Sequence, residues 1–200
     1  MQSRRFFLAL LAAASAAGLF PRPADASPQA ARAFINDLGN EAIGVLQSDQ
    51  PTSVKAERLE EIFRRGFDFV AIGRFILGRH WNTASAQQRQ DFLEAFTDFV
   101  TRSYARRLAD ETVSGFNITN LRDLGDGDYL ARTEIMRGNS APLNYEWRVR
   151  QTENGMRIVD IIIEGVSLLV TQRSDFTSVV QREGMDGLIR TLRAKASQQP

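Results

Sequence analysis

Hydrophobic residues recur at helical spacing through the first half of the chain, and a capping residue precedes most of these runs. The runs predict helices over residues 28–47, from Thr52 or Ser53 onward, over a short apolar segment after Asp68, and over 85–109. The predicted capping residues are Ser27, Asp68 and Ser85. The stripe on the longest helix is rich in aromatic side chains and consists of Phe92, Phe96, Phe99, Val100, Tyr104 and Leu108.

Polar and apolar residues alternate in the second half, which is the two-residue period of a β-strand. The pattern predicts four strands, at residues 117–121, 129–137, 142–150 and 158–163. The segments "DLGDGD", "RGNSAP" and "TENGM" separate them and are rich in turn-forming residues. Consecutive strands are therefore expected to pair as antiparallel neighbours.

The chain returns to a helical pattern over 174–182 and again, after Gly184, over 186–196. An order of helices, then strands, then helices predicts an α+β fold. We expect a curved, mainly antiparallel sheet that is wrapped by several helices.

The third predicted strand indicates which side of this sheet is covered. One side of this strand carries apolar and aromatic residues, and the other carries polar and charged ones. The first set is Leu143, Tyr145, Trp147 and Val149, and the second is Asn144, Glu146, Arg148 and Arg150. The arginine side is expected to face solvent, and the aromatic side to face the helices. A curved sheet under helices is a geometry that can enclose a cavity between the two layers.

The first 26 residues are typical of an export signal. Arg4 and Arg5 form a positive start, the apolar run 6–20 follows, and Ala24-Asp25-Ala26 fits a cleavage site. We interpret the segment as cleaved, because 15 positions are fewer than the roughly 20 that a membrane-spanning helix needs. An uncleaved anchor is the alternative. The paired arginines leave both the general secretory and the twin-arginine routes open.

Removal of this segment leaves residues 27–200 as a single domain and changes the charge balance. Three of the 25 basic residues and one of the 24 acidic residues are lost, which leaves 22 and 23. The remaining chain therefore has a net charge of about −1 and lacks the basic excess of a nucleic-acid-binding protein. We predict no nucleic-acid partner.

Residue types restrict the possible chemistry further. The chain has no cysteine and a single histidine, His80, so thiol catalysis, zinc–thiolate sites and multi-histidine metal sites are excluded. Glu164 lies between Ile163 and Val166 and is a candidate general base in an apolar pocket, as is Asp160 on the same strand. A structural role for both carboxylates, paired with arginines, is the simpler interpretation. We predict no catalytic or metal-binding residue.

The apolar residues allow two interpretations, a well-filled core or a pocket for an apolar ligand. Three blocks of sequence favour the second, because together they resemble the MlaC family, also called the toluene-tolerance family. The blocks are the lead into the longest helix (77–89), "EGVS" (164–167) and "GMDGL" (184–188). His80 departs from the aromatic residue expected at its position.

The resemblance implies a periplasmic phospholipid carrier and an NTF2-like related sheet around an apolar lipid pocket. Such a protein shuttles lipid between an outer-membrane lipoprotein–porin complex and an inner-membrane Mla-type ABC transporter complex, and so maintains outer-membrane lipid asymmetry. The bound phospholipid is cargo, and no cofactor is expected. A hopanoid or sterol-like cargo is the near alternative, and an NTF2-like enzyme that uses Glu164 or Asp160 as its base is the more distant one.

Ten residues are predicted to line the lipid pocket. From the helices and the strands they are Phe75, Leu77, Phe96, Val100, Tyr104, Tyr145, Trp147, Ile161, Ile163 and Val166. The interruption at Glu164-Gly165 is interpreted as a bend or bulge of the last strand at the pocket rim, after which residues 166–169 turn back toward the lipid. Arg173 and Phe176 would then lead into the closing helix.

Overall fold

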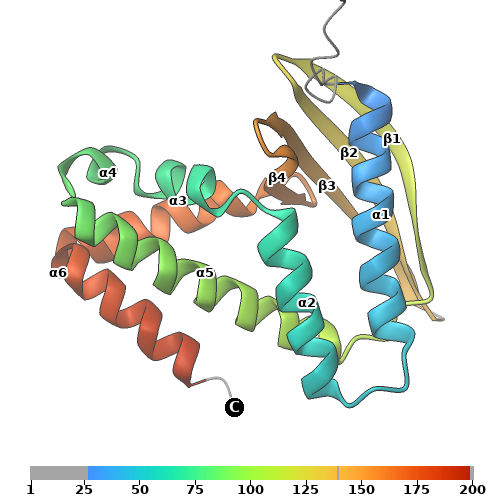
Figure 1. The fold of residues 1–200 in the computed structure, drawn as a ribbon, viewed down its shortest axis with the longest axis horizontal. Helices are drawn as coiled ribbons and strands as arrows, with labels where there is room; N and C mark the ends of the chain where they lie inside the picture. The colour runs from blue at the N-terminus through green and yellow to red at the C-terminus, as the bar shows by residue number, and fades with distance from the viewer. Residues whose placement is uncertain (1–26, 139, 199–200) are drawn as a thin grey trace, which may run out of the picture.

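The computed structural model describes residues 27–138 and 140–198, so the predicted export signal lies outside the described residues. Within these ranges the chain forms six helices and a five-stranded sheet that does not close on itself (Figure 1). The predicted mixed α+β class, with an antiparallel sheet, is confirmed. No helix in the described ranges is both long enough and apolar enough to span a membrane.

The first three helices begin at the predicted positions. They are α1 (Pro28–Gln47), α2 (Thr52–Gly66) and α3 (Phe69–Leu77), of which α1 and α3 follow their capping residues and α2 begins at Thr52 without a side-chain cap. The Ser27 hydroxyl accepts a hydrogen bond from the backbone N–H of Ala30, and the Asp68 carboxylate accepts one from that of Ala71. Each cap satisfies a backbone donor that the helix itself leaves free.

The longest predicted helix is confirmed as α5 (Ala86–Ala109). Ser85 and Gln88 form a reciprocal capping box, in which each side chain accepts a hydrogen bond from the other residue's backbone N–H. The short helix α4 (Arg79–Thr83) was not predicted. It follows Gly78, whose φ of 51° ends α3 in a conformation that favours glycine.

All four predicted strands are present, and each extends further than its pattern. They are β1 (Gly115–Gly125), β2 (Asp128–Arg137), β3 (Ser140–Thr152) and β4 (Gly155–Ile163). Each pairs antiparallel with the next in chain order. The extra length comes from pairing up to two-residue turns such as Asp126-Gly127, where both φ angles are positive and the reversal is tight.

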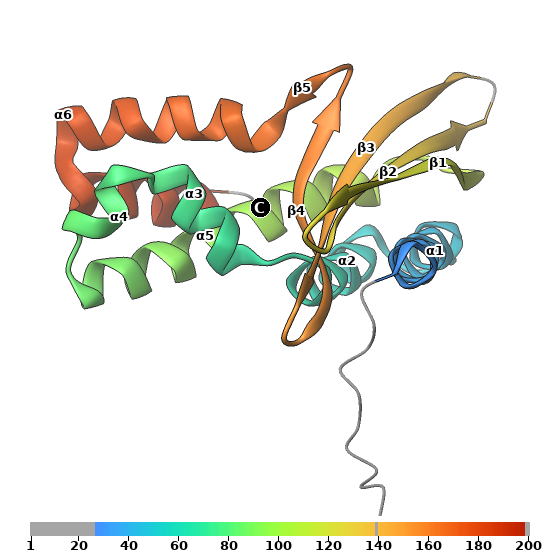
Figure 2. The ribbon, with the colours of Figure 1, turned by 90° about the horizontal axis from the view of Figure 1, so that it is seen from above.

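The predicted sides of the sheet are confirmed. Tyr145 and Trp147 lie on the side that α1 covers, which we call the inner face, and α1 packs Ala31 and Ile35 against it. The opposite side, with Arg148 and Arg150, is called the outer face. Figure 2 shows α1 along one side of the twisted sheet and the helices α3 to α6 in a separate layer.

The interpretation of residues 164–176 is corrected. Glu164 and Gly165 have φ angles of 51° and 80° and form a two-residue turn, not a bend or bulge within one strand. The turn leads into a short fifth strand, β5 (Val166–Ser167), which pairs with β4. Helix α6 (Leu168–Ser197) then begins six residues before the predicted start at 174, capped by the Ser167 hydroxyl, and is kinked at Gly184.

Three clusters of buried side chains hold these elements together. The helical core joins α3, α5 and α6, the sheet core joins α1 to the inner face, and the junction core joins α1, α2 and α5. In the helical core Phe92 stacks on Phe96 with ring centroids 5.5 Å apart, and Phe176 meets both rings edge-on. Such aromatic groups combine a large buried area with favourable geometry.

Replacement of Phe92 by alanine tests the helical core. The ring is fully buried, so its loss leaves a cavity and should lower the free energy of unfolding by about 3–5 kcal/mol. Urea denaturation followed by circular dichroism measures the change. Leu124→Ala, at an exposed position of β1, is the control and should change the stability by about 0.5 kcal/mol or less.

Candidate functional site

The strand residues predicted to line a pocket lie together on the inner face. Tyr145 pairs with Ile163, and Trp147 pairs with Ile161 on the next strand. Ile163 pairs in turn with Val166 of β5, so Tyr145, Ile163 and Val166 form a row across three strands, called the apolar row. The row begins at a half-buried ring and ends at Val166, whose side chain is 57% exposed.

A hydrogen bond and a ring contact position the two aromatic side chains of this face. The indole N–H of Trp147 donates a 2.8 Å hydrogen bond to the hydroxyl of Thr133, which is fully buried. The Tyr145 ring lies 5.9 Å from that of Trp147, centroid to centroid. The inner face therefore presents a fixed aromatic surface next to the isoleucines of β4.

Two further predicted residues lie on α5 and differ in their surroundings. Val100 is half-buried and packs against the helical core, and Tyr104, one turn further along α5, is 41% exposed. Ile135 of β2 packs against the junction core, to which α5 contributes Ala105 and Ala109, so the end of α5 lies near the end of β2.

The other three predicted lining residues lie elsewhere. Leu77 and Phe96 are buried in the helical core, where they pack among side chains of α3, α5 and α6. Phe75 is 40% exposed on α3, and the Arg173 guanidinium carbon stands 4.9 Å from the centre of its ring. The structure thus groups the strand residues on the inner face, whereas Leu77, Phe96 and Val100 pack in or against the helical core. The lining role of all ten residues remains a prediction.

A surface groove of about 530 Å³ lies on a different side of α5. Its lining residues are Arg64, Val70, Trp81, Arg89, Gln90, Leu93, Glu94, Thr97 and Asp98. None of the ten predicted lining residues is among them. The Arg89 side chain stacks near the Trp81 ring and donates to its backbone carbonyl, so the polar residues of this groove already serve the α4–α5 junction.

Neither candidate base, Glu164 or Asp160, lies where a general base is expected. Glu164 is exposed at the tip of the β4–β5 turn, which is not the apolar pocket that a general base would need. Asp160 accepts hydrogen bonds from the Ser167 hydroxyl and from the backbone N–H of Leu169. It therefore fixes the start of α6 against the outer face.

Comparisons with known proteins agree with this architecture. Residues 36–194 match the sequence model of the family described as MlaC protein. This chain belongs to the MlaC family.

One relative and one solved structure show how far the similarity extends. The intermembrane phospholipid transport system binding protein MlaC of Haemophilus influenzae is 28% identical over 130 residues. The match covers 63% of this chain and 61% of that relative, so the chain spans about three-fifths of the relative's length. The solved structure of a phospholipid-binding protein from Ralstonia solanacearum, in complex with a phospholipid, has the same fold, with a TM-score of 0.73 and 23% identity. That similarity covers 84% of this chain and 98% of the other.

The structure adds one apolar residue of this MlaC-family chain that sequence reasoning missed. Val170 lies in the first turn of α6, and 59% of it is exposed. The sequence pattern did not single out Val170, because residues 168–170 continue the apolar run of the preceding strand. The signal that could have located it is Ser167, a good helix cap at the junction of the two patterns.

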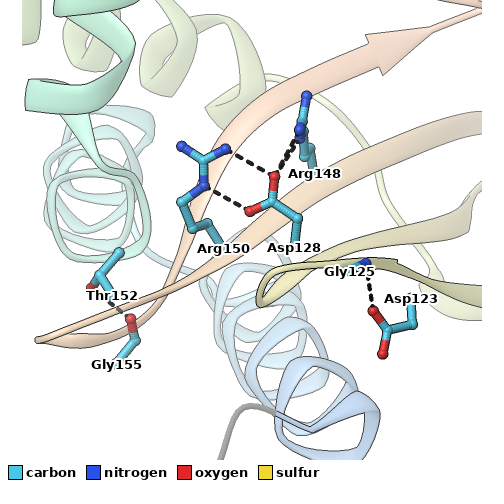
Figure 3. A network of polar contacts seen from close by, with 7 residues as sticks. All are labelled: Asp123, Gly125, Asp128, Arg148, Arg150, Thr152 and Gly155. Atoms are coloured by element: carbon cyan, nitrogen blue, oxygen red, sulfur yellow. Dashed lines mark hydrogen bonds and ion pairs between the residues drawn. The ribbon is translucent and has the colours of Figure 1, made fainter.

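The outer face carries a buried ion cluster. The carboxylate of Asp128, only 6% exposed, accepts two hydrogen bonds from Arg148 and two from Arg150, at 2.7–3.0 Å (Figure 3). These contacts tie the start of β2 to β3. The hydrogen bonds from Arg150 are the main cause of a lowered pKa of Asp128, with a further contribution from Arg148, and burial opposes them.

The lowered pKa of Asp128 gives a pH-dependent prediction. Because the pKa is lower in the folded than in the unfolded chain, the stabilisation is complete above about pH 4 and is lost as the pH falls through the folded-state value. Asp128→Asn should therefore lower the unfolding free energy by about 1–2 kcal/mol at pH 7, since the arginines are partly exposed.

Urea unfolding of both forms between pH 7 and pH 3 measures this difference, which should shrink toward the acid end. Glu153→Gln, at an exposed turn position, is the control and should show little change. A difference that stays constant over the whole range contradicts an ionic origin.

Proposed function

We propose that this MlaC-family protein is a periplasmic phospholipid carrier. The observation that carries the proposal is an apolar surface that remains open to solvent beside the inner face. Tyr104, Val166 and Val170 are all exposed, and Val166 is the open end of the apolar row across β3, β4 and β5. Exposed apolar groups that adjoin one another mark a binding surface more often than a solvated one. The names of both relatives refer to phospholipid.

The physical chemistry of lipid transfer supports an apolar surface of this kind. Burial of an acyl chain contributes about 0.8 kcal/mol per methylene, so two long tails gain roughly 20 kcal/mol relative to water. A bilayer offers nearly the same gain, and a carrier needs only to match it. Transfer to and from a membrane complex can then be close to thermoneutral, provided that few strong polar contacts hold the lipid.

The proposal includes the cellular setting. The protein reaches the periplasm through its export signal and moves phospholipid between an outer-membrane complex and an inner-membrane Mla-type ABC transporter complex. This traffic maintains the lipid asymmetry of the outer membrane. The family and the transport-system name of the Haemophilus relative support this setting.

Lipid extraction of the purified protein tests the class of function. Protein expressed with its own signal and purified from the periplasm should carry phospholipid in about equimolar amount, visible by native mass spectrometry and by chromatography of an extract. A hopanoid in the extract, in place of phospholipid, would identify a different cargo for the same carrier. An empty protein, with a turnover that Glu164→Gln abolishes, would contradict the carrier and support the enzyme.

Two charge substitutions test the position of the lipid. Val166→Glu and Tyr104→Asp place a carboxylate beside the apolar row, where its burial against acyl chains is costly, and each should remove most of the co-purified lipid. Both side chains are exposed, so the thermal unfolding of each variant should stay close to that of the wild type.

Leu124→Glu is the matched control for these substitutions. It introduces the same charge at an exposed apolar position of β1, outside the predicted lining, and should leave the lipid content unchanged. Retention of lipid by both test variants would mean that the lipid binds elsewhere on the protein.

A further inference from the structure

Two arginines and a tyrosine gather where the end of β2 meets the end of α5. Ile135 of β2 packs against the junction core, to which α5 contributes Ala105 and Ala109, so this end of the strand lies near the last turns of the helix. Arg137 follows two residues later, so it lies on the same inner side of the strand. Tyr145 lies on that side of β3, and Arg107 lies on α5 one turn after Tyr104.

Within the part of the chain that the structure describes, Arg107 and Arg137 have no carboxylate partner, in contrast to three arginines of the outer face. On the outer face Arg132, Arg148 and Arg150 all pair with carboxylates. Across residues 27–138 and 140–198, neither Arg107 nor Arg137 forms an ion pair. Arg137 at the end of β2 and Arg107 on α5 therefore carry charges that no carboxylate of the described residues neutralises, and both charges can act on a ligand.

The Nε atom of Arg137 is the more informative of these donors. It is buried and has no hydrogen-bond partner in the described part of the chain. A guanidinium group cannot lose its proton in a protein, so a buried N–H of this kind costs free energy until an acceptor reaches it. An anionic oxygen is the acceptor that best matches it.

The charge environment of Tyr145 links the three side chains. Burial raises the pKa of the Tyr145 hydroxyl, Arg137 and Arg107 oppose that rise, and Glu111 adds to it. The hydroxyl therefore stays protonated at neutral pH and can donate a hydrogen bond. Glu111 is the carboxylate near this group, and it is exposed at the end of α5.

We propose that Arg107, Arg137 and Tyr145 bind the phosphate of the lipid cargo, an inference that rests on the proposed carrier function. Planar guanidinium groups present paired N–H donors that fit phosphate oxygens. Tyr145 is also the first residue of the apolar row, so a phosphate at its hydroxyl directs the acyl chains along Ile163 toward Val166.

This arrangement gives selection for a lipid class without selection for its headgroup. All phospholipids share the phosphate, whereas the alcohol attached to it would extend beyond Arg107, which is exposed. The carrier would then accept phospholipids of different headgroups and discriminate against a lipid with the same tails and no phosphate.

Competition between two lipids with identical tails tests the site. The purified protein is incubated with vesicles that contain dioleoylphosphatidylglycerol and dioleoylglycerol in equal amounts, then separated, and its bound lipid is quantified by mass spectrometry. The wild type should favour the phospholipid by about tenfold or more, because charged hydrogen bonds are lost with the phosphate. Arg107→Gln/Arg137→Gln should bring the ratio close to that of the vesicles.

Further variants separate this role from a structural one. Arg102→Gln, at another exposed position of α5, is the matched control and should keep the wild-type ratio. Arg107→Gln alone, on the exposed side of the helix, should lower the ratio without affecting the fold. Tyr145→Phe retains the ring and should lower the ratio by a few fold, whereas Glu111→Gln should raise it.

The outcomes distinguish the phosphate site from the carrier function. A wild type that takes up neither lipid contradicts the carrier itself. A wild type that prefers the phospholipid, with a double-arginine variant that does so equally, overturns the phosphate site and leaves the carrier intact. Titration with inorganic phosphate tests whether the arginines bind the free ion and not the lipid. If the free ion binds at the arginines and their loss leaves the lipid ratio unchanged, the site serves free phosphate and the proposal fails.

Discussion

Burial of α5 between two different cores is the constraint on which the rest of the structure depends. Its N-terminal half carries Phe92 and Phe96 into the helical core, and its C-terminal half carries Ala105 and Ala109 into the junction core with α2 and β2. One helix of 24 residues therefore connects the helical core with the junction core at the sheet. Tyr104 and Arg107 occupy exposed positions of its second half.

The two faces of the sheet differ in how far their polar and apolar groups are satisfied within the protein. On the outer face Asp128 is neutralised within the protein by hydrogen bonds from Arg148 and Arg150. On the inner face the apolar row adjoins exposed valines, and Arg137 retains a buried donor without a partner. A surface that is unsatisfied in both its apolar and its polar groups is one that a lipid, with tails and a phosphate, can complete.

The candidate site shows the limit of reasoning from residue type. Phe96 and Val100 lie on the same predicted helical stripe, yet Phe96 is buried among the phenylalanines of the helical core and Val100 is only half-buried. Aromatic and aliphatic residues serve a core and an apolar ligand equally well, because both exclude water in the same way. Nothing in the spacing separates the two roles, since the distinction depends on which other segment covers the residue.

The sequence by itself determined the features that arise within a few residues of each other. Ser27, Asp68 and Ser85 begin their helices by capping a backbone N–H three residues away, and the alternation in β3 assigns Trp147 and Arg148 to opposite faces. Tertiary structure alone decided where Leu168 belongs, which end of α5 lies near the sheet, and that the charges of Arg137 and Arg107 act on Tyr145. Those outcomes depend on contacts between residues far apart in the chain, whose free energies exceed the local preferences that a pattern records.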